Sequence, residues 1–277
     1  MKFRDKLKEI SLKNNSLVCV GLDSDISKLP EFIRNGQHPQ STFNKAIIEA
    51  THDLVCAFKP NSAFYEERGH AGIEALKMTC EYLREKYPEI PIIIDAKRAD
   101  IGNTNLGYAK FVFDYLQADA VTLHPFLGKE ALQPFLDYKD KGIIVLCRTS
   151  NPGAGEFQDL MVNGKKLFQI VAENVVSKWN ANGNCGLVVG ATYPGELEIV
   201  RHIVGDNFPL LIPGIGTQGA DVEKTVKAGV DRDGLNAIIN SSRGIIFAYS
   251  EADFADRARQ EAIKLRDDTN KYRKESI

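Results

Sequence analysis

Short apolar runs alternate with segments of helical spacing along the chain, and this alternation restricts the possible folds more than any other feature. Eight runs are predicted to be strands, at 17–22, 55–58, 92–94, 119–124, 142–147, 186–189, 209–212 and 236–239. In the segments between them, apolar residues recur every three or four positions, which is typical of amphipathic helices. Continuous apolar runs indicate strands that are buried on both faces, as in a parallel sheet.

Eight strand–helix units in 277 residues predict an α/β fold of the (β/α)8 or TIM-barrel type. An open, doubly wound sheet would show the same alternation, but a count of eight favours closure into a barrel. No Pro-rich, Ser-rich or low-complexity stretch divides the chain, so we expect a single domain over 1–277. Within it, about 1–15 should form a helix that covers one end of the core, and about 253–271 a C-terminal helix.

The composition excludes several classes of protein. A hydrophobic content of 43% suits a soluble globular protein, and a net charge of −2 gives no general attraction to nucleic acid. The five cysteines are scattered without a C-x-x-C pair, which predicts a reducing, cytoplasmic compartment. Four of them lie in or beside apolar runs and are expected to be small buried residues: Cys19, Cys56, Cys147 and Cys185. No apolar run is long enough to span a membrane, and the first residues do not resemble a signal peptide.

Charged residues follow the third predicted strand directly. Asp95 and Lys97 are separated by one residue, so they should share one face of the strand, and Asp100 should lie in the turn just beyond it. A single ion pair would be an ordinary feature of a strand end. Three charges at the end of one buried strand favour chemistry, because unpaired charge is costly in such a place.

The other predicted strands also end in polar residues, on the side where TIM barrels have their active sites. These residues are Asp23, Lys59, Asn61, His124, Thr149, Ser150, Tyr193 and Arg243. Gly214, Gly216 and Gly219 follow the seventh strand as G-x-G-x-x-G, which suits a tight turn and an anion-binding loop about equally well. Arg243 follows two serines at the start of a helix, and the two features together favour phosphate binding.

Six short motifs carry a resemblance to a known family. They are G-L-D at 21–23, F-K-P-N at 58–61, D-A-K-R-A-D-I-G-N-T at 95–104, T-S-N-P-G at 149–153, P-G-I-G-T-Q-G at 213–219 and S-R-G at 242–244. In this order they resemble the orotidine 5′-phosphate decarboxylase family over about 16–248, and the longer loops are similar to its longer-chain branch. The D-x-K-x-x-D core is shared with other sugar-phosphate enzymes of the same superfamily, whereas Lys59, Ile101 and the Gln218 loop are more specific.

The resemblance implies a carboxy-lyase that converts orotidine 5′-monophosphate to uridine 5′-monophosphate and CO2, in de novo pyrimidine biosynthesis and without a metal or organic cofactor. It implies that Lys97 donates a proton to C6. Lys97 would act within a charged array formed with Lys59, Asp95 and Asp100. Asp100 would come from the neighbouring subunit of a homodimer with shared active sites.

The resemblance also assigns the substrate contacts. Asp23 and Lys59 would hold ribose hydroxyls together with Thr104 of the partner subunit, and Ser150 would meet the pyrimidine. Gln218 would bridge the base and phosphate loops, and Arg243 would hold the phosphate. The expected substrate-binding set is completed by Asn61, Ile101 and Gly216. The segment from 151 to 165 is long, and its covering role is left open.

Two other functions are compatible with parts of this pattern. A metal-dependent sugar-phosphate lyase or decarboxylase of the same superfamily would keep the Asp95, Lys97 and Asp100 core. A non-catalytic phosphate-binding barrel would keep Arg243 and the glycines, but it would not need the two lysines. Magnesium removal and turnover of the nucleotide separate these alternatives. Neither nucleic acid nor membrane is expected as a partner.

Overall fold

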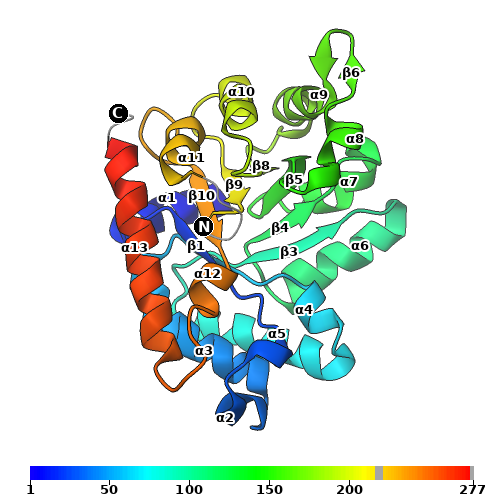
Figure 1. The fold of residues 1–277 in the computed structure, drawn as a ribbon. Coiled ribbons are helices and arrows are strands. Elements are labelled where there is room, and N and C mark those ends of the chain that lie inside the picture. Colours follow the sequence, from blue (N-terminus) through cyan, green and yellow to red (C-terminus); the bar gives the residue numbers. More distant parts are fainter. Residues whose placement is uncertain (216–220, 275–277) are drawn as a thin grey trace.

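Eight parallel strands form a nearly closed barrel in the computed structural model, which describes residues 1–215 and 221–274 (Figure 1). The strands are β1 (Val18–Gly21), β2 (Ala57–Lys59), β3 (Ile93–Arg98), β4 (Ala120–Leu123), β5 (Gly142–Arg148), β8 (Cys185–Val189), β9 (Leu210–Pro213) and β10 (Ala237–Ser241). Each of the eight predicted runs overlaps one of these strands. β3 continues four residues beyond the predicted run, so that it includes the charged residues at its carboxyl end.

The barrel closes between β2 and β3, the strands at the two ends of the sheet order. The strand order is β2-β1-β10-β9-β8-β5-β4-β3, and two parallel bridges, Phe58 with Ile92 and Asn61 with Asp95, join the two ends of this order. The Phe58 amide donates to the Pro91 carbonyl and the Asp95 amide to the Pro60 carbonyl, each at 3.0 Å. This closure confirms the predicted barrel and excludes the doubly wound sheet.

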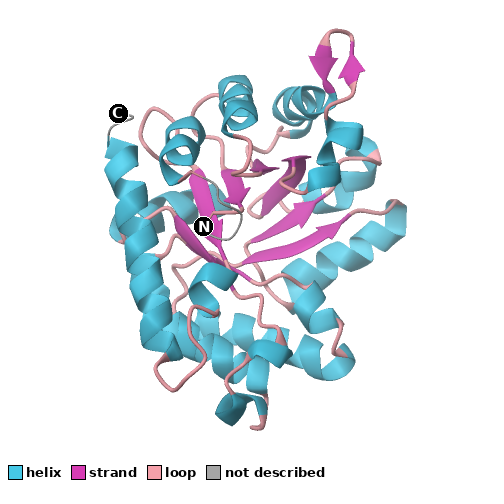
Figure 2. Cartoon of the chain, viewed as in Figure 1, coloured by secondary structure: helices cyan, strands magenta, loops and turns pink. Residues whose placement is uncertain are grey.

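Helices surround the strands on the outside (Figure 2). They are α1 (Phe3–Lys13), α2 (Glu31–Arg34), α3 (Pro39–Thr51), α4 (Ala63–Glu66), α5 (Gly69–Lys86), α6 (Gly102–Lys110), α7 (Gly128–Leu136), α8 (Gly155–Gln158), α9 (Leu167–Asn174), α10 (Pro194–Val204), α11 (Val222–Gly229), α12 (Arg243–Ile246) and α13 (Phe254–Lys274). Short 3-10 turns cover Ile26–Lys28, His52–Leu54 and Pro152–Ala154, and π-helical turns extend α6 over Phe111–Tyr115 and α9 over Val175–Trp179. Among the described residues, no helix has the length and apolar character needed to cross a membrane.

The helix α1 lies across the amino ends of several strands. The Phe3 amide donates to the Asp140 carbonyl at 2.8 Å, Arg4 Nη1 to the Gly183 carbonyl at 2.9 Å, and Lys6 Nζ to Asp119 Oδ2 at 2.8 Å. These acceptors come just before β5, β8 and β4. The contacts therefore hold α1 against the amino end of the barrel and leave the carboxyl end open.

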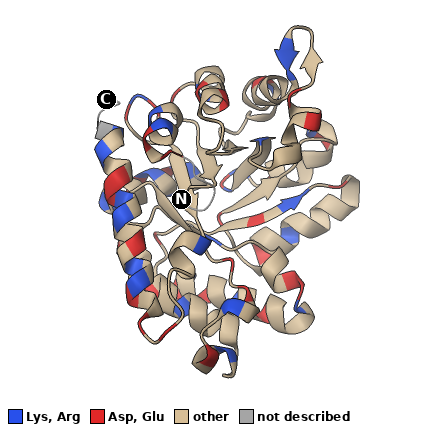
Figure 3. Cartoon of the chain, viewed as in Figure 1, with Lys and Arg blue, Asp and Glu red and all other residues tan. Residues whose placement is uncertain are grey.

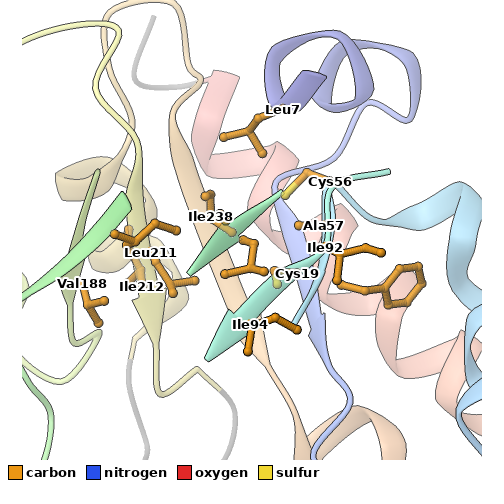
Figure 4. Packing of buried hydrophobic residues seen from close by; sticks show 14 of the residues in the cluster. Leu7, Cys19, Cys56, Ala57, Ile92, Ile94, Val188, Leu211, Ile212 and Ile238 are labelled. Atoms are coloured by element: carbon orange, nitrogen blue, oxygen red, sulfur yellow. The ribbon is translucent and has the colours of Figure 1, made fainter. Parts of the chain in front are cut away.

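Apolar side chains fill the barrel and the layer between strands and helices (Figure 4). Ile94, Leu211 and Ile238 are among the buried residues that line this core, and Leu7 of α1 is also buried. All five cysteines are buried and free, which confirms the burial predicted for four of them and adds Cys80. Burial raises the pKa of Cys19 to about 12. Charged residues are spread over the outer helices, with a dense set on α13 (Figure 3). The charges of β3 are an exception, because they lie on a strand of the barrel.

The segment between β5 and α9 contains a hairpin that the sequence interpretation missed. An antiparallel pair, β6 (Met161–Val162) and β7 (Lys165–Lys166), projects beyond the ring of helices (Figure 1). Its turn is formed by Asn163 and Gly164, which have φ angles of +50° and +79°. Asn-Gly is the preferred pair for a tight hairpin turn that needs two positive φ angles. This dipeptide could therefore have revealed the hairpin.

Candidate active site

A cavity of about 480 Å³ opens among the carboxyl ends of the strands. Its charged wall consists of Lys59, Asp95 and Lys97. The remaining described lining residues are Leu146, Thr149, Ser150, Asn151, Gln158, Val188, Leu211 and Pro213. The cavity thus combines an apolar floor with charged and hydroxyl groups at its rim, which is typical of small-molecule sites.

Asp95 is the centre of the charged wall. Its Oδ2 lies 3.0 Å from Lys59 Nζ and its Oδ1 lies 2.6 Å from Lys97 Nζ. Thr122 Oγ1 donates a third hydrogen bond to Oδ1 at 2.8 Å. The carboxylate therefore receives donors from β2, β3 and β4, and Asp95 and Lys97 lie together as predicted from their spacing.

The electrostatics favour the charged forms of Asp95 and Lys59. Burial by itself would raise the pKa of Asp95, but the nearby charges of Lys59 and Lys97 outweigh burial and hold this pKa well below its usual range. Burial would likewise lower the pKa of Lys59, but Asp23 and Asp95 raise it above its ordinary value. Lys59 is 3% exposed, whereas 46% of the Lys97 side chain is exposed, so the Lys97 ammonium is the one that faces the cavity opening.

The backbone at Lys97 has an unusual conformation. Its φ angle is +47°, a left-handed conformation that costs a residue with a side chain roughly 1–2 kcal/mol. The regular pairing of β3 with β4 is interrupted between Ile94 and Arg98. Strained residues of this kind often occur at functional sites, where the surrounding structure holds them in place.

Asp23 and Asn61 lie beside Lys59. Asp23 Oδ1 is 3.8 Å from Lys59 Nζ and accepts a hydrogen bond from the Asn61 amide at 3.2 Å. The side-chain oxygen of Asn61 accepts from the Ala63 amide at 3.1 Å, at the first residue of α4. Asp23 is therefore close to the charged wall, and part of the Asn61 side chain is engaged in starting a helix.

Gln158, at the end of α8, ties the segment after β5 to the rim of the cavity. Its Oε1 accepts from the Thr149 amide and its Nε2 donates to Thr149 Oγ1, both at 2.8 Å. Next to Thr149, the buried Arg148 pairs with Asp159 Oδ2 at 3.1 Å and lies over the Tyr193 ring at 4.1 Å. These contacts fix the backbone beside Ser150. The sequence interpretation did not identify Gln158 as a lining residue.

Other predicted residues lie outside this cavity within the single chain. Asp100 Oδ1 accepts from the Ile101 amide at 2.7 Å, and among the described residues Asp100 forms no ion pair with Lys59 or Lys97. Thr104, on α6, lines a separate cavity of about 560 Å³ that also contains Arg98 and Tyr108. The sequence predicted that Asp100 and Thr104 serve the active site of a partner subunit, and the single chain does not test this prediction.

The predicted phosphate residues are only partly described. Arg243 is exposed at the first residue of α12, and its side chain forms no hydrogen bond or ion pair within 1–215 and 221–274. Ser242, just before it, lies so close to Gly21 that a Cβ atom at Gly21 would be 1.8 Å from Ser242 Oγ. The predictions for Gly216 and Gln218 fall outside the described residues. No group of three or more His, Cys, Asp or Glu side chains is arranged for metal binding in the described part of the chain.

Comparison with known proteins places this site in a family. Residues 16–258 match the family model for the "Orotidine 5'-phosphate decarboxylase / HUMPS family". Orotidine 5′-phosphate decarboxylase of Ralstonia nicotianae is 50% identical over 273 residues, which cover 99% of this chain and 100% of the relative. The protein of the same name from Cupriavidus necator is 50% identical over 274 residues, which are 99% of each chain.

Solved structures agree with the sequence relatives. The structure of Leishmania donovani OMP decarboxylase has a TM-score of 0.85 and 38% identity, with 99% of each chain covered. A putative orotidine-monophosphate decarboxylase from Toxoplasma gondii has a TM-score of 0.89 and 35% identity, with 100% of this chain and 97% of that chain covered. With its motifs, its barrel and its matches over nearly the whole length, this chain belongs to the orotidine 5′-phosphate decarboxylase / HUMPS family.

Proposed function

We propose that this protein is a carboxy-lyase that converts orotidine 5′-monophosphate to uridine 5′-monophosphate and CO2, a step of pyrimidine biosynthesis. The observation that supports this most is the pair of short contacts that Asp95 makes with Lys59 and Lys97 at the cavity, in a chain whose full-length relatives carry the decarboxylase name. The metal-dependent lyase that the motifs left open finds no support among these relatives.

Lys97 is the proton donor in the proposed mechanism. When the bond between C6 and the carboxylate breaks, its electron pair stays on C6, which no adjacent carbonyl can stabilise. An ammonium held beside that carbon stabilises the developing negative charge and then transfers a proton from Nζ to C6. Asp95, 2.6 Å from Lys97 Nζ, holds this ammonium in position before the reaction.

The substrate contacts belong to the same proposal. Asp23 and Lys59 hold ribose hydroxyls, and Ser150 meets the base. Their positions around one cavity or beside its lysine support these roles. At the phosphate end, Arg243 binds the phosphate with the help of Gly216 and Gln218, and its exposed side chain forms no hydrogen bond or ion pair within the described residues. Asn61 and Ile101 complete the substrate-binding set.

We propose further that the protein is a homodimer with shared active sites. Asp100 and Thr104 would then complete the site of the partner subunit. Support comes from exposed apolar side chains in the segments that follow β3 and β4, where Ile101 has 61% and Phe126 has 82% of its surface exposed. Apolar surface of this kind is often covered by another chain.

A cytoplasmic location is also proposed, because all five cysteines are free.

The test is turnover of orotidine 5′-monophosphate, followed by its absorbance with and without a metal chelator. The decarboxylase is expected to be active in both cases, and the Lys97→Ala variant to bind the nucleotide but lose nearly all turnover, because its proton donor is missing. Activity that disappears with the chelator would favour a metal-dependent enzyme. Binding without turnover by the wild-type protein would favour a non-catalytic barrel.

A further inference from the structure

Thr122 on β4 connects Asp95 and Lys97 of β3 through a single hydroxyl group. Its Oγ1 accepts a hydrogen bond from the Lys97 amide at 3.0 Å and donates one to Asp95 Oδ1 at 2.8 Å. A hydroxyl has one proton to donate. Because the amide can only donate, the direction of both bonds is fixed, and the Thr122 proton must go to the carboxylate.

The amide bond holds the irregular part of β3 in place. Ile94 pairs with Val121 and Arg98 with Leu123, so the three residues 95–97 of β3 lie opposite the single residue Thr122. A strand that carries extra residues loses regular backbone pairing at that point. The Thr122 side chain supplies an acceptor for the Lys97 amide there. It thereby stabilises the residue whose φ angle is +47°.

The second bond sets the orientation of the Asp95 carboxylate. Oδ1 accepts from both Thr122 and Lys97 Nζ, while Oδ2 faces Lys59. Without the hydroxyl, the donors left to the carboxylate among the described residues would be two lysine side chains, each with several rotatable bonds. Thr122 is fully buried, and its own side chain therefore has little freedom to move.

We propose that Thr122 is a positioning residue, which places the Lys97 ammonium through the bulged backbone of β3 and through Asp95. This inference rests on the proposed role of Lys97 as the proton donor. A shift of about 1 Å at a reacting group can lower a rate on the order of 10²-fold. Loss of the hydroxyl should therefore reduce kcat, whereas KM should change little, because Thr122 does not line the cavity.

The experiment compares three variants in steady-state decarboxylation and thermal unfolding. Thr122→Val removes the hydroxyl and keeps the branched shape, and Thr122→Ser keeps the hydroxyl. Thr51→Val is the matched control, because Thr51 is also fully buried and its Oγ1 donates to the Ile47 carbonyl at 2.7 Å within α3. We expect Thr122→Val to lose on the order of 10²-fold in kcat with a nearly unchanged KM. Thr122→Ser should recover most of that loss, and Thr51→Val should keep its kcat.

Several outcomes would overturn the inference. A folded Thr122→Val protein with the wild-type kcat would do so, as would a Thr122→Ser protein that is as slow as the valine variant. If the valine variant does not fold, Thr122→Ala takes its place under the same criteria. If neither variant folds, the test is the kcat of a stably folded Thr122→Ser protein, with Thr51→Val as the control. A strongly reduced kcat in Thr122→Ser beside a wild-type kcat in Thr51→Val would then refute the inference. Failure of the proposed function looks different, since the wild-type protein itself would then release no CO2 from the nucleotide.

Discussion

Asp95→Asn should destabilise the folded protein strongly, because Asp95 is the nearer of the two carboxylates that compensate the buried Lys59. At 3.0 Å and an effective dielectric constant of about 20, the attraction between Lys59 and Asp95 is about 5.5 kcal/mol. The pair of Lys59 with Asp23 at 3.8 Å remains in the variant and contributes about 4.4 kcal/mol on the same scale. The Lys97 side chain is 46% exposed, so hydration of its ammonium compensates most of the attraction to Asp95 that it loses in the variant.

The net effect is smaller than the direct attraction, since an asparagine also avoids the cost of burying a carboxylate. Removing one partner of a buried pair typically costs about 3–5 kcal/mol. Because Asp23 remains beside Lys59, we expect the lower end of this range, about 3 kcal/mol. In urea unfolding, this loss of stability should lower the transition midpoint and leave the m-value unchanged.

A matched control neutralises an acidic residue in a partly exposed pair. Glu81→Gln removes the partner of Lys77 on α5, where Glu81 Oε1 lies 3.8 Å from Lys77 Nζ and both side chains are partly exposed. This change should alter the free energy of unfolding by less than about 0.5 kcal/mol. If Asp95→Asn were as mild as Glu81→Gln, the reasoning that Asp95 compensates a buried charge would be wrong.

Three further predictions address pH, phosphate binding and assembly. The pKa of Asp95 in the folded protein lies below its unfolded value of about 3.9, so the ionised carboxylate stabilises the folded protein above that value. This stabilisation is lost as the pH falls toward the folded pKa. The free energy of unfolding should therefore depend less on pH in the acid range in Asp95→Asn than in the wild type. Arg243→Ala should greatly raise KM for the nucleotide and barely affect a nucleoside without phosphate, and equal losses on both substrates would speak against a phosphate role. Mixing inactive Asp100→Ala and Lys97→Ala chains should restore activity up to about half that of a normal dimer, because one site of each heterodimer is intact. Heterodimers that stay inactive would show that Asp100 acts within its own chain.

The barrel was predictable because its strands are largely buried on both faces and are therefore mostly apolar. Ile92, Ile93 and Ile94 identify β3 in this way. The same reasoning ended the strand too early, since charged residues at 95–98 do not look like barrel interior. The spacing of Asp95 and Lys97 predicted that they meet, but it could not reveal the left-handed backbone at Lys97, which depends on a side chain of β4.

Residues that act across long sequence separations were harder to find. Thr122 is the one polar residue among the four from Ala120 to Leu123, which was a usable signal. Gln158 had no such signal, because its contact with Thr149 depends on how the chain folds back between them. The residues that a partner subunit would contribute, Asp100 and Thr104, can be recognised from the family motif but not from the fold of one chain.

The way the barrel closes links substrate binding to the dynamics of the protein. β2 and β3 are joined by two isolated bridges, and Lys59 and Asp95 lie on either side of that junction. Elements with few backbone pairs open first in native-state hydrogen exchange, so the amides of Phe58 and Asp95 should exchange sooner than those of the fully paired strands. A nucleotide that contacts both sides would slow this local opening. At a concentration of 100 times its Kd, such a ligand would add about 2.7 kcal/mol to the free energy of separating the two strands.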